Sequence, residues 1–165
     1  MNIRGCLLFL VLTLAAAALP SVALAKEGDL RIVRVWPEWR DGKSFKRISE
    51  YFTGRENTGG QLIQRTDPAR RTGYYFLVRL ENPAGPRSVQ ARLRLILPDS
   101  PAEQTTAFTV ALRPGANVLN LGLTTAAWGD PKHQPVAWLL QVVSPDDGTV
   151  LATEKSYLWD KPAGK

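Results

Sequence analysis

Alternation of apolar and polar residues constrains this chain more than any other feature of its sequence. Between Val89 and Leu97 every second residue is apolar, and most residues between them are polar. Residues 74–80 repeat the pattern. Neighbouring side chains of an extended strand point to opposite faces, so a period of two places one face in a core and the other in solvent. Both segments are therefore predicted to be half-buried β-strands.

Two hairpins are predicted in the C-terminal half. Residues 106–112 and 119–123 alternate on either side of a turn that contains proline and glycine. Residues 136–143 and 149–159 flank a second turn, which ends in Asp-Gly. Glycine adopts the positive φ of tight turns at little cost, so both turns favour a reversal of the chain between paired strands.

The N-terminal half gives weaker signals. Residues 29–36 are predicted to form a first strand, and residues 47–53 an edge strand with which residues 61–66 can pair. Proline and glycine stand at nearly every junction. Seven to nine short strands with this spacing predict an all-β fold, an antiparallel β-sandwich of the immunoglobulin-like or fibronectin-like type. A jelly roll is the alternative architecture.

Residues 1–25 have the pattern of a secretory signal peptide. A largely apolar run, residues 6–19, is closed by Pro20, and Ala23 and Ala25 supply the small residues that signal peptidase accepts. We therefore expect cleavage after Ala25 and a periplasmic or secreted protein. No stable membrane anchor is expected after cleavage, because a spanning helix needs about 18 or more unbroken apolar residues.

The remaining chain is predicted to be one domain held by its core alone. Cys6 is the only cysteine and lies in the predicted signal peptide, so the mature chain can form no internal disulfide. Residues 26–160 are expected to form a single β-sandwich domain, followed by a disordered tail at residues 161–165. Removal of Arg4 from a chain with a formal charge of +6 leaves +5, which suits contact with anionic surfaces.

The residue inventory argues against an enzyme. The chain has one histidine, His133, and lacks a G-x-S-x-G elbow and a phosphate-binding glycine loop. A triad built on His133 stays possible, because its members need only be neighbours in space. Asp146 and Asp147 are adjacent in a predicted turn, where aspartate commonly bonds to nearby backbone. No catalytic residue, cofactor or metal is therefore expected.

Tryptophans supply the first set of candidate binding residues. Trp138 alternates in phase with its apolar neighbours and is predicted to pack in the core. Trp36, Trp39 and Trp128 lie in or beside predicted loops, where exposed indoles can stack on sugar rings or peptides. Structural packing of these three residues is the alternative.

Arginines supply the second set. Arg79, Arg92 and Arg94 fall on the polar phase of two consecutive predicted strands. If those strands pair as a hairpin, Arg79 lies opposite or diagonal to Arg92, and the three cations form a surface suited to an anionic partner. A solvated face that deters edge aggregation is the alternative.

These features favour an exported, non-enzymatic binding or assembly module of the cell envelope or extracellular space. Its expected partner is an envelope or extracellular macromolecule, either anionic or a polysaccharide. No nucleic-acid partner is expected, because the chain carries no recognition motif. The two alternatives are a carbohydrate-binding module that uses the loop tryptophans and a small hydrolase whose acid pair is assembled by folding.

Overall fold

The computed structural model describes residues 30–160. The predicted signal peptide, its cleavage after Ala25 and the predicted tail at 161–165 lie outside the described residues and stay predictions. Across residues 30–160, the structure contains no helix of the length and apolar character that a membrane crossing requires.

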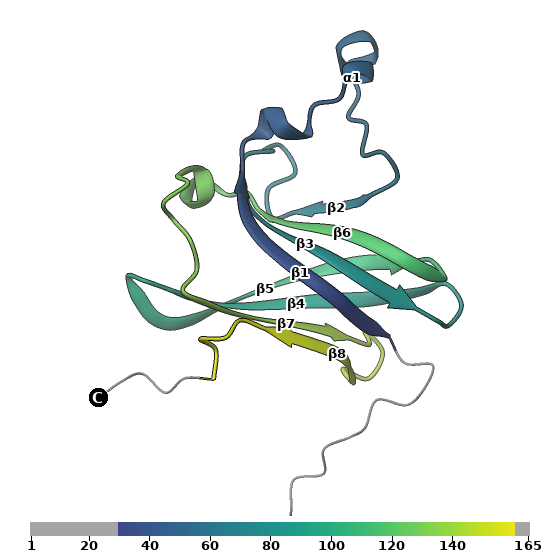
Figure 1. The fold of residues 1–165 in the computed structure, drawn as a ribbon, viewed down its shortest axis with the longest axis vertical. Helices are drawn as coiled ribbons and strands as arrows, with labels where there is room; N and C mark the ends of the chain where they lie inside the picture. The colour runs from purple at the N-terminus through teal and green to yellow at the C-terminus, as the bar shows by residue number, and fades with distance from the viewer. Residues whose placement is uncertain (1–29, 161–165) are drawn as a thin grey trace, which may run out of the picture.

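The described residues form an all-β fold of two four-stranded sheets (Figure 1). Sheet A has the order β1 (Arg31–Arg40), β3 (Gly73–Asn82), β6 (Gly115–Leu123), β2 (Leu62–Arg65). Sheet B has the order β5 (Ser100–Leu112), β4 (Arg87–Leu97), β7 (Ala137–Val143), β8 (Val150–Lys155). The helical segments are short: η1 (Gly42–Phe45), α1 (Ile48–Thr53) and η2 (Ala126–Gly129). The predicted all-β class is confirmed.

One apolar cluster joins the facing sides of the two sheets. Phe76 and Val78 of β3 and Leu93 of β4 are fully buried members of this cluster. The rings of Phe76 in sheet A and Trp138 in sheet B meet edge to face, with centroids 5.6 Å apart. Trp138 is 9% exposed, which confirms its predicted place in the core.

One of the two predicted hairpins is present in the structure and the other is absent. β7 and β8 pair antiparallel, as predicted. β5 and β6 do not pair, because β5 belongs to sheet B and β6 to sheet A. β3 and β4 are separated in the same way, so both short connections cross between the sheets.

Buried amides hold the two crossing connections together. The Asn82 Nδ2 donates to the carbonyl oxygens of Gly85 and Arg113, each at 3.1 Å. The Asn117 Nδ2 donates to the same Arg113 oxygen at 2.8 Å. These bonds satisfy backbone carbonyl groups of the two connections.

The prediction of an edge strand at residues 47–53 was wrong, because this segment contains α1. Glu50 accepts a hydrogen bond from the Arg47 backbone nitrogen at 3.3 Å, which ties the first turn of α1 to the residue that precedes it. Gly54 ends the helix at φ 66°, a left-handed conformation that glycine adopts most easily. The predicted partner of this segment, now β2, instead pairs in parallel with β6.

Candidate functional site

Residues 41–61, which connect β1 to β2, project beyond one end of the two sheets (Figure 1). We call this segment the β1–β2 insertion. It carries η1 at its base and α1 at its tip. The insertion has three structural features: an aromatic anchor on sheet A, a set of ion pairs and a basic pocket.

The aromatic anchor is Tyr75, a fully buried residue on the outer face of sheet A. Phe45 of η1 packs on its ring, with centroids 4.6 Å apart. The Tyr75 hydroxyl donates to the Arg71 carbonyl oxygen at 2.7 Å and accepts from the Arg65 Nε at 2.9 Å. Burial raises the pKa of Tyr75, so the hydroxyl stays protonated and can make both bonds. Gly122 lies against this ring, which leaves no space there for a side chain.

Three ion pairs attach the insertion to Arg65 of β2 and to Arg71, which precedes β3, the third being a longer contact of 3.8 Å between Glu56 and Arg71. Arg65 donates from both terminal nitrogens to the Glu56 carboxylate, at 2.9 and 2.6 Å. Arg71 donates to Glu50 at 2.6 Å, and the Glu50 side chain is only 3% exposed. Glu50 also accepts from the backbone nitrogen of Asn57 at 3.1 Å. The hydrogen bonds from Arg71 and Arg65 lower the pKa of Glu50 and Glu56, respectively, so both carboxylates are charged at neutral pH.

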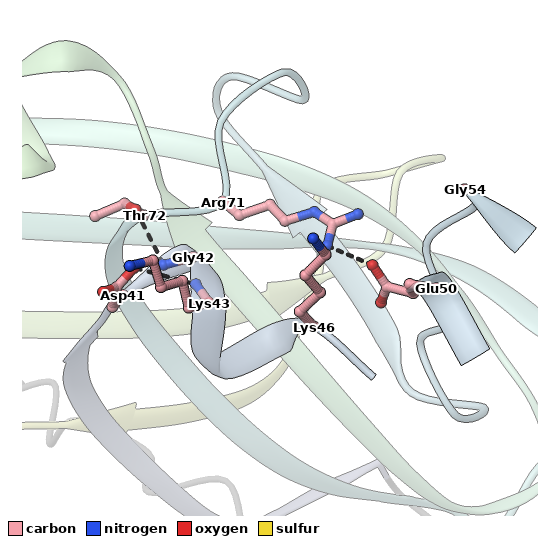
Figure 2. Close-up of a pocket in the computed structure, with 8 residues that line it drawn as sticks. All are labelled: Asp41, Gly42, Lys43, Lys46, Glu50, Gly54, Arg71 and Thr72. Carbon is pink, nitrogen blue, oxygen red and sulfur yellow. Dashed lines mark hydrogen bonds and ion pairs between the residues drawn. The ribbon is translucent and has the colours of Figure 1, made fainter. Parts of the chain in front are cut away.

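A basic pocket of about 530 Å³ opens between η1, α1 and the chain that enters β3 (Figure 2). Its lining residues are Asp41, Gly42, Lys43, Lys46, Glu50, Gly54, Arg71 and Thr72. Of the two acids in the lining, Glu50 pairs with Arg71, whereas Asp41 is exposed and accepts only from the Lys43 backbone nitrogen at 3.1 Å. Figure 2 shows the Lys46 side chain extending toward Arg71 and Glu50. Because the lining has more cations than acids, the pocket can receive an anionic group beside Lys43 and Lys46.

The exposed side of α1 is apolar. Ile48, Tyr51 and Phe52 are 78%, 70% and 85% exposed, and their spacing of three and four residues places them on one helix face. The Lys46 ammonium lies 4.4 Å from the centre of the Tyr51 ring. Glu50 is the buried residue of this helix. The usual orientation of a surface helix, apolar side inward and charged side outward, is thus reversed.

The structure does not place the three candidate tryptophans together. Trp36 is half-buried, and the guanidinium carbons of Arg34 and Arg79 lie 4.7 and 5.3 Å from the centre of its ring. Trp39 packs toward the core, and its Nε1 donates to the Trp128 carbonyl oxygen at 3.2 Å. Trp128 is 6% exposed. Packing thus accounts for Trp39 and Trp128, while Trp36 stands apart from both.

The hairpin that would have brought the three candidate arginines together is absent. Arg79 lies on β3 in sheet A, whereas Arg92 and Arg94 lie on β4 in sheet B. The β3–β4 connection crosses between the sheets, so the pairing on which the cluster depended does not exist. Arg94 instead forms an ion pair with Glu103 and lies 5.3 Å from the centre of the Trp159 ring.

The titratable residues considered for chemistry have structural contacts. His133 is half-buried, with its ring 4.7 Å from that of Trp128. Asp147 accepts from the Thr149 backbone nitrogen at 3.1 Å, as its predicted turn position favours. The Thr149 hydroxyl also donates to Asp147, and these bonds lower the Asp147 pKa to about 2. Within residues 30–160, no three His, Cys, Asp or Glu side chains are grouped so that they could hold a metal ion.

Sequence reasoning missed the residues that build this site. Glu50, Glu56 and Tyr75 were not singled out as binding or anchoring residues, and Arg65 and Arg71 were considered only among the arginines of a possible charged surface. A local signal was available for α1 alone: apolar residues at 48, 51 and 52, with a glutamate three positions after Arg47 and a glycine at 54.

Comparisons of the chain with protein-family models, with curated proteins and with solved structures found no match.

Proposed function

We propose that this protein is an exported, non-enzymatic binding or assembly module that contacts an envelope or extracellular macromolecule through the β1–β2 insertion. The observation that carries the proposal is the reversed orientation of α1. Its apolar residues Ile48, Tyr51 and Phe52 point to solvent, while its glutamate is buried in an ion pair.

This orientation has no explanation in folding stability. A surface helix normally gains its stability from the burial of an apolar face, and α1 buries none of its large apolar side chains. The buried Glu50–Arg71 pair adds stability, but desolvation offsets part of its attraction, and the pair does not require the apolar side chains to face solvent. Exposed apolar side chains grouped on one element are instead typical of contact surfaces.

The sheet order supports an immunoglobulin-like scaffold for this insertion. In the proposed scaffold, β1, β3 and β6 correspond to strands A, B and E, and β4, β7 and β8 correspond to strands C, F and G. β5 then corresponds to a C′ strand beside C. Binding segments of such scaffolds lie at the ends of the sandwich, where the β1–β2 insertion also lies.

Retention on the native envelope tests the proposed function. The variant Ile48→Ser/Tyr51→Ser/Phe52→Ser removes the exposed apolar face, and Val136→Ser/Val150→Ser is the matched control at exposed apolar positions elsewhere. We expect the exported protein and the control to be retained by envelope or extracellular material of the source cell, and the triple variant to lose at least about tenfold in retention. Equal retention of the triple variant would refute the proposal.

A photoreactive phenylalanine at position 52 gives an independent readout. It should form crosslinks in the same material, whereas the same probe at Val150 should not. Circular dichroism and the urea midpoint of each variant establish that the fold is retained. Crosslinks at both positions, or at neither, would count against the insertion as the contact surface.

A further inference from the structure

We propose that the partner of the β1–β2 insertion is an anionic lipid surface, on which α1 lies with Ile48, Tyr51 and Phe52 among the headgroups. This inference rests on the proposed role of the insertion as the contact surface, and it commits to the lipid of the envelope in place of a macromolecule. The residue types suit such a surface. Isoleucine and phenylalanine enter the boundary of the hydrocarbon region, and tyrosine combines an apolar ring with a polar tip at the headgroup level.

The charge exposed around α1 is mainly positive. Within the insertion, Glu50 is buried and pairs with Arg71, Glu56 pairs with Arg65, and Asp41 is an exposed acid just before η1. The cations of the same stretch, Lys43, Lys46, Arg47 and Arg55, are all exposed residues. None of the ion pairs formed among residues 30–160 uses these four side chains. The segment therefore presents apolar groups and an excess of positive charge to the same partner.

The arrangement of these groups matches the layers of an anionic bilayer surface. α1 stands at the tip of the insertion, beyond the ends of both sheets, so that a flat surface can reach it (Figure 1). Lys46 lies against the Tyr51 ring, which places a cation directly beside the apolar face. Lys43 and Lys46 also line the basic pocket behind the tip, where a lipid phosphate can be received (Figure 2).

A lipid surface fits better than a folded protein partner because the contact is small. Stable protein interfaces bury about 800 Å² on each partner. α1 has six residues and exposes three large apolar side chains, and even a fully buried aromatic side chain contributes no more than about 250 Å². A membrane compensates for a small apolar contact through electrostatic attraction, at about fivefold in affinity for each basic residue near the surface.

Vesicle binding tests this inference with the exported protein. We compare vesicles of phosphatidylcholine alone with vesicles that contain phosphatidylglycerol, by sedimentation at low salt. Binding is expected only to the anionic vesicles and should weaken at physiological ionic strength, where charges are screened over about 8 Å. Lys46→Gln/Arg55→Gln should lose about 25-fold in affinity, at roughly fivefold per cation. The control Arg113→Gln/Lys132→Gln removes the same charge from exposed positions outside the insertion and should bind almost normally.

Insertion of the apolar face needs its own readout. The mature chain is predicted to lack cysteine, so an environment-sensitive dye can be attached at Phe52→Cys, with Cys6→Ser included to make the label unique. Its emission should shift to the blue on anionic vesicles, while the same dye at Val150→Cys should not respond. Binding without this shift would show adsorption by charge alone and would refute the proposed position of α1.

The failure of this inference can be distinguished from failure of the proposed function. Absence of binding to anionic vesicles would refute a lipid partner. If position 52 nevertheless crosslinks to a protein or polysaccharide and the triple serine variant loses envelope retention, the insertion is a binding site for a different class of partner. If neither vesicles nor native material responds to changes in α1, both proposals fall.

Discussion

Gly122→Ala is expected to destabilise the domain by forcing a methyl group into the Tyr75 ring. A Cβ built on Gly122 would lie 2.4 Å from Cε1 and 2.8 Å from Cζ of that ring, both inside van der Waals contact. The ring cannot easily move, because its hydroxyl bonds to Arg71 and Arg65 and its face packs on Phe45. Overpacking of this kind costs about 1–3 kcal/mol. The entropic gain of replacing glycine, about 0.4–1 kcal/mol, offsets only part of it.

Urea unfolding followed by tryptophan fluorescence measures this cost. Gly85→Ala is the matched control, because its added Cβ meets no atom within 4 Å and its backbone does not have a positive φ. A double-mutant cycle with Tyr75→Leu identifies the cause, since the cost of Gly122→Ala should largely disappear once the ring is absent. A variant as stable as the parent, or a cost that persists without the ring, would refute the packing argument.

Two further predictions concern the core and the ion pairs. Trp138→Ala should lower the free energy of unfolding by about 3–5 kcal/mol, the usual cost of removing a large buried aromatic. The control Trp159→Ala removes a half-buried ring over Arg94 and should cost less than about 1 kcal/mol. Equal costs would contradict the assigned core. Glu50 and Glu56 have pKa values lowered from 4.5, so their ion pairs should stabilise the fold fully above about pH 4.5 and progressively less as the pH falls through the folded values. Urea midpoints between pH 7 and pH 3 should therefore fall less steeply in Glu50→Gln/Glu56→Gln than in the parent, and parallel curves would exclude this contribution.

The strands of the core were predictable because each has a long uninterrupted alternation. β3 and β4 were found at almost their full length, and Trp138 was placed correctly from its phase. Alternation specifies which residues share a face, but it carries no information on which strand pairs with which. The β3–β4 and β5–β6 connections therefore resembled hairpins, although both cross between the sheets. The buried amides of Asn82 and Asn117 that join these connections give no local pattern in the sequence.

The candidate site was largely beyond sequence reasoning. Ile48, Tyr51 and Phe52 are residue types enriched in strands, and six residues are too few to establish a helical period. The contacts that position the helix join distant residues, such as Glu50 and Arg71, which are 21 positions apart. Pairing of this kind depends on where β2 and β3 carry Arg65 and Tyr75, and thus on the completed fold.

The manner in which α1 is held has a consequence for binding. A flexible loop with the same apolar and basic residues would have to lose conformational freedom on contact, and this loss would weaken its affinity. Here the Glu50–Arg71 pair, the Glu56–Arg65 pair and the packing of Phe45 on Tyr75 fix the insertion before any partner arrives. The same contacts pair the two carboxylates with Arg71 and Arg65, so they do not neutralise the exposed cations of the insertion. Anchoring and electrostatic complementarity thus depend on the same two glutamates.

Glu50→Gln/Glu56→Gln should therefore weaken vesicle binding even though it removes two negative charges, because the gain in net positive charge does not replace the lost orientation of α1. Stronger binding by this variant would show that charge alone, without a fixed helix, is sufficient.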